Sequence, residues 1–264
     1  MTTSNQTLAP GPTPAPVQHV ALIVGGGPGI SASCARLFAR SGMWVAVAAR
    51  RIDKPVLLDL EQQHGVRRYA CDAVDPASVA ALFQKVTADL GPPTLVVHNI
   101  DGRVTGILRK AITDAEPALA FETLRNATFS AFLVGQQAAR CMLANPPDAN
   151  GARGTLIFTN ASASIKGFAL SGAFAMACHA KTGLAQSMAR ELMPQGIHVV
   201  NVPIDAAVGW TQADGTRAHR LAGTAVDDNL ADPDHIAQTY LQLHRQHRST
   251  WACEVVLRPW TEKW

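Results

Sequence analysis

The chain has 264 residues, of which 47% are hydrophobic and 16% are charged, and its formal net charge is +3. This length suits one large α/β domain, and the basic residues form no stripe of the kind that nucleic-acid binding needs. Five cysteines without a close pair indicate free thiols in a reducing, cytoplasmic compartment.

Residues 1–18 contain prolines at every second position from Pro10 to Pro16, and neither a basic residue nor an apolar run. This composition excludes a signal peptide and predicts a disordered tail. No apolar run approaches the ~20 residues that a membrane-spanning helix needs. We therefore expect a disordered tail over 1–18 and a single soluble domain over 19–264.

Apolar runs of strand type alternate regularly with helical patterns along the rest of the chain. This alternation predicts a doubly wound parallel sheet of Rossmann type with about seven strands and helices on both faces. The segment 204–231 has weak periodicity and is predicted to be a flexible excursion. The predicted strands are 20–24, 44–48, 67–71, 94–98, 154–159, 197–202 and 252–257, and the predicted helices are 29–41, 54–63, 76–90, 117–143, 172–193 and 233–247.

The first predicted strand, 20–24, breaks into Gly25, Gly27 and Gly29, and the helix predicted over 29–41 follows with Ile30 in its first turn. Glycines permit tight turning and close backbone approach, and free amides at a helix N-terminus bind phosphate groups. Set in a strand-turn-helix unit, this loop predicts the phosphate site of a dinucleotide.

Arg50 and Arg51 follow the second strand, where an NAD site would place an acid for the ribose hydroxyls. A guanidinium suits a 2′-phosphate instead, although both arginines could also be solvated loop residues. Asp72 follows the third strand and could accept a hydrogen bond from adenine, or it could be an acid in the first turn of a helix. These residues favour NADP(H), with NAD(H) as the alternative.

The order of these motifs resembles the short-chain dehydrogenase/reductase family over residues 19–264. GGGPGIS (25–31) is similar to the family's TGxxxGIG loop, and GLAQSMARELMPQGIHVVNV (183–202) is similar to its helix and sixth strand. The ending, DPDHIAQTY (232–240) with LRPWTEKW (257–264), looks like a bacterial subgroup of uncharacterised oxidoreductases. The resemblance implies hydride transfer between the cofactor and a small carbonyl or alcohol, in a homodimer or homotetramer.

The catalytic pair of that family, a Tyr and a Lys four residues later, is missing at the matching positions. Phe174 stands at the Tyr position and Cys178 at the Lys position. A phenyl group transfers no proton, and a neutral thiol does not replace an ammonium. Lys181 lies seven residues beyond Phe174, which places it about two turns, ~10 Å, further along the helix.

Of the other matching positions, some keep the family's residue and others have lost it. Ser162 matches the catalytic Ser, although a loop hydroxyl that caps backbone amides would look the same. Asn99 keeps one Asn of the family's NNAG motif, whereas Ala127 stands at the position of the catalytic Asn. Ser31 replaces the last glycine of the phosphate loop and is expected to loosen the contact between strand and helix slightly.

The sequence therefore predicts an NADP(H)-type oxidoreductase with weak or absent activity. The alternative is a catalytically silent relative that binds a nucleotide or a partner protein. His244 and His247 have a helical spacing that suits metal ligands but no third ligand, so no metal site is predicted. Neither nucleic acid nor a membrane is expected as a partner.

Overall fold

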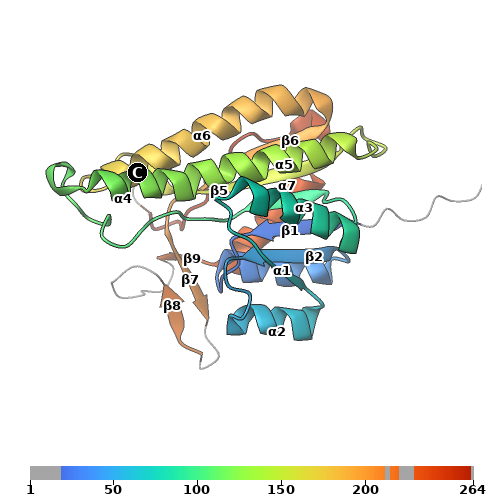
Figure 1. Ribbon diagram of the computed structural model, residues 1–264, viewed down its shortest axis with the longest axis horizontal. Helices are drawn as coiled ribbons and strands as arrows, with labels where there is room; N and C mark the ends of the chain where they lie inside the picture. Colours follow the sequence, from blue (N-terminus) through green and yellow to red (C-terminus); the bar gives the residue numbers. More distant parts are fainter. Residues whose placement is uncertain (1–18, 212–214, 220–228, 263–264) are drawn as a thin grey trace, which may run out of the picture.

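The computed structural model describes residues 19–211, 215–219 and 229–262, and the predicted tail over 1–18 lies outside these ranges (Figure 1). A parallel sheet of six strands runs through the middle of the molecule in the order β3-β2-β1-β4-β5-β6. The order reverses between β1 and β4, as the predicted doubly wound fold requires. The strands are β1 (Val20–Val24), β2 (Trp44–Ala49), β3 (Arg67–Ala70), β4 (Leu95–His98), β5 (Gly154–Ala161) and β6 (Ile197–Ile204).

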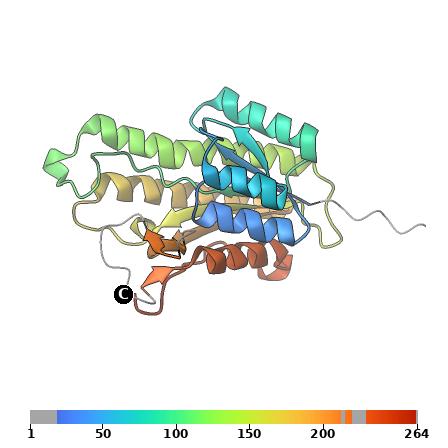
Figure 2. The same cartoon turned by 90° about the horizontal axis from the view of Figure 1, so that it is seen from below.

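Helices cover both faces of this sheet, because its strands are apolar on both sides (Figures 1 and 2). Val20, Leu22 and Val24 belong to a core under α3, α5 and α6, while Ala21 and Ile23 belong to a second core under α1, α2 and α7. The fold class predicted from the alternating pattern is thereby confirmed. The helices are α1 (Ile30–Arg40), α2 (Pro55–His64), α3 (Pro76–Leu90), α5 (Ser130–Ala144), α6 (Gly172–Leu192) and α7 (Pro233–Arg245).

The long helix predicted over 117–143 is divided. It consists of α4 (Pro117–Leu124), a π-helical turn over Arg125–Phe129, and α5. The hydroxyl of Ser130 donates to the carbonyl of Asn126 at 2.5 Å and lies 2.8 Å from Nε2 of the buried His98. The π turn therefore lies where the helix passes the end of β4.

The seventh strand predicted over 252–257 is not a regular strand. This segment pairs with β6 only through isolated parallel bridges, Asn201 with Glu254 and Ile204 with Leu257. The amides of Val255 and Leu257 donate to β6, and those of Asn201 and Asp205 donate back. Between the two bridges stands Pro203, which has no N–H to donate, and this interrupts the ladder.

The segment after β6 is more regular than the flexible excursion predicted over 204–231. It contains β7 (Ala207–Thr211), β8 (Arg217–His219) and β9 (Leu230–Ala231), which form a small sheet in the order β8-β7-β9. The rest of the predicted excursion, 212–214 and 220–228, lies outside the described residues. Short 3₁₀ turns occupy Ile112–Asp114, Ser162–Ser164, Met193–Gln195 and Arg248–Thr250.

None of the helices in the described ranges has the length and apolar character needed to cross a bilayer.

Candidate functional site

Two adjoining cavities, of about 310 and 570 Å³, open beyond the carboxyl ends of the strands where the strand order reverses. Ligands of doubly wound sheets bind at this place. Because the cavities share several lining residues, they form one crevice along the edge of the sheet. The shared residues are Gly25, Gly26, Lys54, Asn99, Ile100, Asp101 and Arg103.

The glycines of the loop between β1 and α1, the predicted phosphate loop, differ in how much space surrounds them. Gly25 has φ +111°, and a Cβ there would lie 2.3 Å from the carbonyl oxygen of Asn99. Its amide and that of Gly26 donate to Ala48 at the end of β2, at 2.9 and 3.0 Å. A Cβ on Gly27, in contrast, would meet no atom of the described residues within 4 Å. Gly25 thus anchors the loop, and Gly27 leaves a bare backbone facing the smaller cavity.

The N-terminus of α1 meets this cavity at Gly29, Ile30 and Ser31. No side chain in the described part of the chain caps the helix, and its first turn carries no acidic residue. The first amides of a helix lack partners within the helix, and the helix dipole favours an anion there. These residues therefore fit the pyrophosphate of a dinucleotide.

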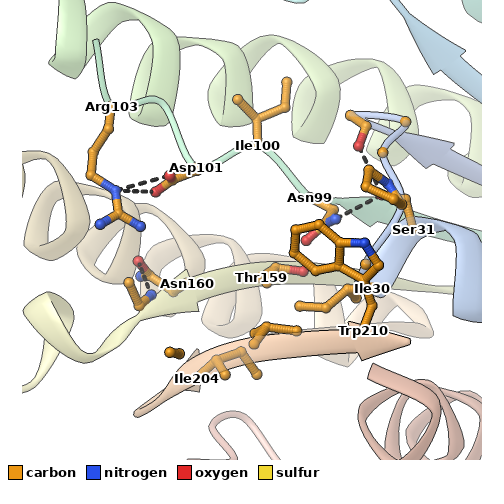
Figure 3. A pocket seen from close by; sticks show the side chains of 18 of the residues that line it. Ile30, Ser31, Asn99, Ile100, Asp101, Arg103, Thr159, Asn160, Ile204 and Trp210 are labelled. Carbon is orange, nitrogen blue, oxygen red and sulfur yellow. Dashed lines mark hydrogen bonds and ion pairs between the residues drawn. The ribbon is translucent and has the colours of Figure 1, made fainter. Parts of the chain in front are cut away.

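Ser31 tightens the loop rather than loosening it, contrary to the expectation from the sequence. Its side chain is buried, and its hydroxyl donates to the carbonyl of Gly25 at 2.7 Å. The side-chain amide of Asn99 donates to the same hydroxyl, also at 2.7 Å (Figure 3). A glycine would lack both bonds, so the hydroxyl compensates for the changed residue.

The larger cavity contains the residues predicted for the adenosine half. Arg50, Arg51 and Asp72 all line it, and both arginines are exposed. Lys54, which the sequence analysis did not single out, lines both cavities and donates from Nζ to the carbonyl of Gly26 at 2.7 Å. Its position directly before α2 was the only sequence signal for it.

Phe174, Cys178 and Lys181 of α6 also line the smaller cavity, and all three are buried. The side chain of Lys181 reaches this cavity although the residue lies two turns beyond Phe174. Its Nζ donates to the carbonyls of Ile100 at 3.0 Å and Thr159 at 3.2 Å. Burial lowers the pKa of Lys181 to about 8 and raises the pKa of Cys178 to about 11.

Arg103 and Asp101, which no sequence pattern singled out, form an ion pair beside Phe174. Nε of Arg103 donates to both carboxylate oxygens of Asp101, at 2.9 Å each. The guanidinium carbon lies 4.5 Å from the centroid of the Phe174 ring. Figure 3 shows Arg103 reaching from its loop toward Asn160 on β5. No local sequence pattern predicts the contact between Arg103 and Phe174, because it joins the loop after β4 to α6.

Ser162 lies in the 3₁₀ turn after β5 and lines neither cavity, whereas Thr159, Asn160 and Ala161 line the smaller one. The amide of Asn160 is engaged with the Cys178 carbonyl, Thr182 and Asn201. Trp210 of β7 also lines the smaller cavity and lies close to Gly29. A Cβ built on Gly29 would be 3.8 Å from the Trp210 ring. Among the described residues, no group of three or more His, Cys, Asp or Glu could hold a metal ion.

Comparison with known proteins agrees with this architecture. A protein-family model described as enoyl-(acyl carrier protein) reductase matches residues 25–256. The chain belongs to the short-chain dehydrogenase/reductase family of oxidoreductases.

Among curated relatives, momilactone A synthase of Oryza sativa subsp. japonica is 30% identical over 187 residues, which cover 69% of this chain and 64% of the rice enzyme. The match thus spans less than two thirds of that relative's length. A short-chain dehydrogenase from Rhodopseudomonas palustris has 28% identity and a TM-score of 0.73, covering 93% of this chain and 100% of that one. A metagenomic short-chain oxidoreductase in complex with NADP has 22% identity and a TM-score of 0.72, covering 91% and 97%.

Proposed function

We propose that the chain binds NADP(H) in this crevice and transfers hydride slowly between the nucleotide and a small carbonyl or alcohol. One observation carries the proposal: each predicted cofactor residue lines at least one of the two adjoining cavities. These residues are Gly25, Gly27, Gly29, Ile30, Arg50, Arg51, Asp72 and Asn99. We further propose that residues 19–264 form one domain and that the protein acts in the cytoplasm, in keeping with its free cysteines.

The preference for NADP(H) over NAD(H) rests on charge. Arg50 and Arg51 follow β2 and line the larger cavity, where their guanidinium groups can bind a 2′-phosphate with paired hydrogen bonds. Asp72 lines the same cavity and can accept from the adenine amino group. The NADP complex of the metagenomic relative has the same fold and supports this choice.

The nicotinamide ring supplies or accepts the hydride when the cofactor is bound, and the chain has to move the proton. Phe174 has no proton to give, and Ser162 lines neither cavity. Lys181 lines the smaller cavity as an ammonium with a pKa of about 8, which suits proton exchange near neutral pH. Loss of a positioned acid typically costs ~10²–10⁴ in rate, so we expect slow turnover in which Lys181 or water relays the proton.

The second candidate is a catalytically silent protein that binds the nucleotide or a partner. The contact between Arg103 and Phe174 favours it, because the guanidinium covers the ring that stands at the Tyr position. In that case the pocket would bind ligands without turning them over.

Calorimetric titration with NADPH, followed by turnover of a panel of carbonyl compounds, separates these candidates. The oxidoreductase predicts tight NADPH binding together with slow NADPH oxidation that depends on the carbonyl compound. Binding without any oxidation would favour the silent protein. Absence of NADPH binding would overturn both nucleotide-binding proposals.

We also propose that the protein forms a homodimer or homotetramer. Phe121, Phe129 and Phe132 are 67%, 42% and 42% exposed on α4, the π turn and α5, and the rings of Phe129 and Phe132 stack at 6.2 Å. Exposed aromatic clusters of this kind mark interaction surfaces. Sedimentation equilibrium tests this proposal: Phe132→Glu should dissociate the oligomer, and a monomeric wild type would contradict it.

A further inference from the structure

Arg103, which lines both cavities, is held in place by two different contacts. Both oxygens of Asp101 accept from Nε, and the guanidinium carbon lies over the Phe174 ring, 4.5 Å from its centroid. A carboxylate fixes the position of the group, and a ring face is attractive to a cation. Together they orient a side chain that is otherwise flexible.

The two terminal NH₂ groups of Arg103 remain available. Within the part of the chain that the structure describes, both of its hydrogen bonds and its ion pair to Asp101 start from Nε. The side chain is 26% exposed and lines both cavities, so a ligand in the crevice can reach it. An arginine whose terminal nitrogens are free presents a planar pair of donors that matches a carboxylate.

The charges around the smaller cavity are not balanced. Arg103 and Lys181 line it as cations, and Asp101 is the one carboxylate among the described lining residues of the smaller cavity. Lys54, the remaining cation of that lining, donates to the phosphate loop. A neutral ligand beside Phe174 would leave the excess positive charge uncompensated in a partly enclosed space.

We propose that Arg103 binds a carboxylate of the substrate, so that the cavity accepts small carbonyl compounds that are also acids, such as oxo acids. This inference rests on the proposed function, in which the nucleotide takes the rest of the crevice. In this arrangement the Phe174 ring supports the guanidinium that binds the substrate carboxylate. Arg103 is then a specificity-determining residue that takes no part in proton transfer.

Calorimetric titration of the NADPH-saturated protein with acetoacetate and with its uncharged methyl ester tests the proposal. The acid should bind at least ~10-fold more tightly than the ester, since one charge-assisted hydrogen bond accounts for this factor. Arg103→Gln should abolish the preference, and Arg103→Lys should keep part of it. The control, Lys110→Gln, removes one charge from the same exposed loop outside both cavities and should leave the preference unchanged.

Equal binding of acid and ester by the wild type, or a preference that survives in Arg103→Gln, would overturn the proposal. Tighter binding of inorganic phosphate than of acetoacetate in the same titration would also overturn it, because the site would then be a phosphate site. A separate NADPH titration of the wild type and Arg103→Gln distinguishes failure of the proposed function from failure of this inference about Arg103. No NADPH binding by the wild type refutes the proposed function, whereas NADPH affinity lost only in Arg103→Gln assigns Arg103 to the nucleotide.

Discussion

Asn99 and Ser31 lie 68 residues apart in sequence and are joined by a 2.7 Å hydrogen bond from the side-chain amide to the hydroxyl. The same hydroxyl donates a hydrogen bond to the carbonyl of Gly25. The end of β4, the start of α1 and the phosphate loop are thereby connected through one buried oxygen. The shape of the proposed phosphate site depends on this connection.

Replacement of Ser31 by Ala should lower the free energy of unfolding by ~1–3 kcal/mol, because the Asn99 amide and the Gly25 carbonyl lose a buried partner. Urea denaturation measures this loss. Ser33→Ala is the matched control, since Ser33 is equally buried on α1 but among the described residues its hydroxyl accepts from Arg36 alone. Equal losses in the two variants would show that the connection through Ser31 has no special weight.

Gly27→Ala should weaken NADPH binding ~10-fold or more and leave the free energy of unfolding within ~1 kcal/mol of the wild type. The new methyl group meets no atom of the described residues within 4 Å, and Gly27 lines the cavity in which we place the phosphates. Gly25→Ala should instead destabilise the fold by ~2 kcal/mol or more, because its φ is positive and the Asn99 carbonyl blocks a Cβ. Titration calorimetry and thermal unfolding of both variants check the contrast, and full NADPH affinity in Gly27→Ala would contradict the assignment of the loop.

Arg50→Ala should reduce the affinity for NADPH by ~10-fold and leave the affinity for NADH unchanged, since only the first has a 2′-phosphate. Arg51→Ala, measured alongside, shows whether the second arginine shares the task or is a solvated loop residue. Competitive titration with both nucleotides provides the numbers. If the variants lose affinity for NADH and NADPH equally, the arginines do not bind the 2′-phosphate.

Lys181 makes the stability depend on pH in a specific direction. Its pKa is about 8 in the folded chain and 10.5 ordinarily, so the folded state loses the proton first as the pH rises. Burial of the ammonium therefore costs stability below pH 8, and this cost disappears between pH 8 and about 10, at up to ~1.4 kcal/mol per pH unit.

The difference in unfolding free energy between Lys181→Met and the wild type isolates this effect from the other titrating groups. It should favour Lys181→Met most below pH 8 and shrink toward pH 10. Lys85→Met, which changes an exposed lysine, should show no such trend. A difference that is constant from pH 7 to pH 10 would show that Lys181 titrates normally.

Local patterns in the sequence were sufficient for the first six strands and for the glycine turn after β1. The apolar run Val20–Val24 followed by glycines predicts a strand, a turn and a helix without knowledge of the rest of the chain, and the structure has them there. The predicted strand at 252–257 failed because its ladder depends on Pro203 of β6, a partner some 50 residues away. Single-segment patterns carry no information about such a partner.

The surroundings of Phe174 were harder to predict for the same reason. The matches of Phe174 and Cys178 follow from sequence register, and both line the smaller cavity. The positions of Lys181 and Arg103 depend instead on the carbonyls of Ile100 and Thr159, on Asp101 and on the Phe174 ring, which come from different elements. Only the assembled fold brings these groups together.

The absence of a proton donor at Phe174 is tested most directly by the turnover number of Phe174→Tyr relative to the wild type, at saturating NADPH and with one carbonyl substrate. The variant places a phenol in the cavity that also contains the Lys181 ammonium, so its turnover should rise ~10-fold or more. Rapid turnover by the wild type, with no gain in the NADPH-bound variant, would contradict this account.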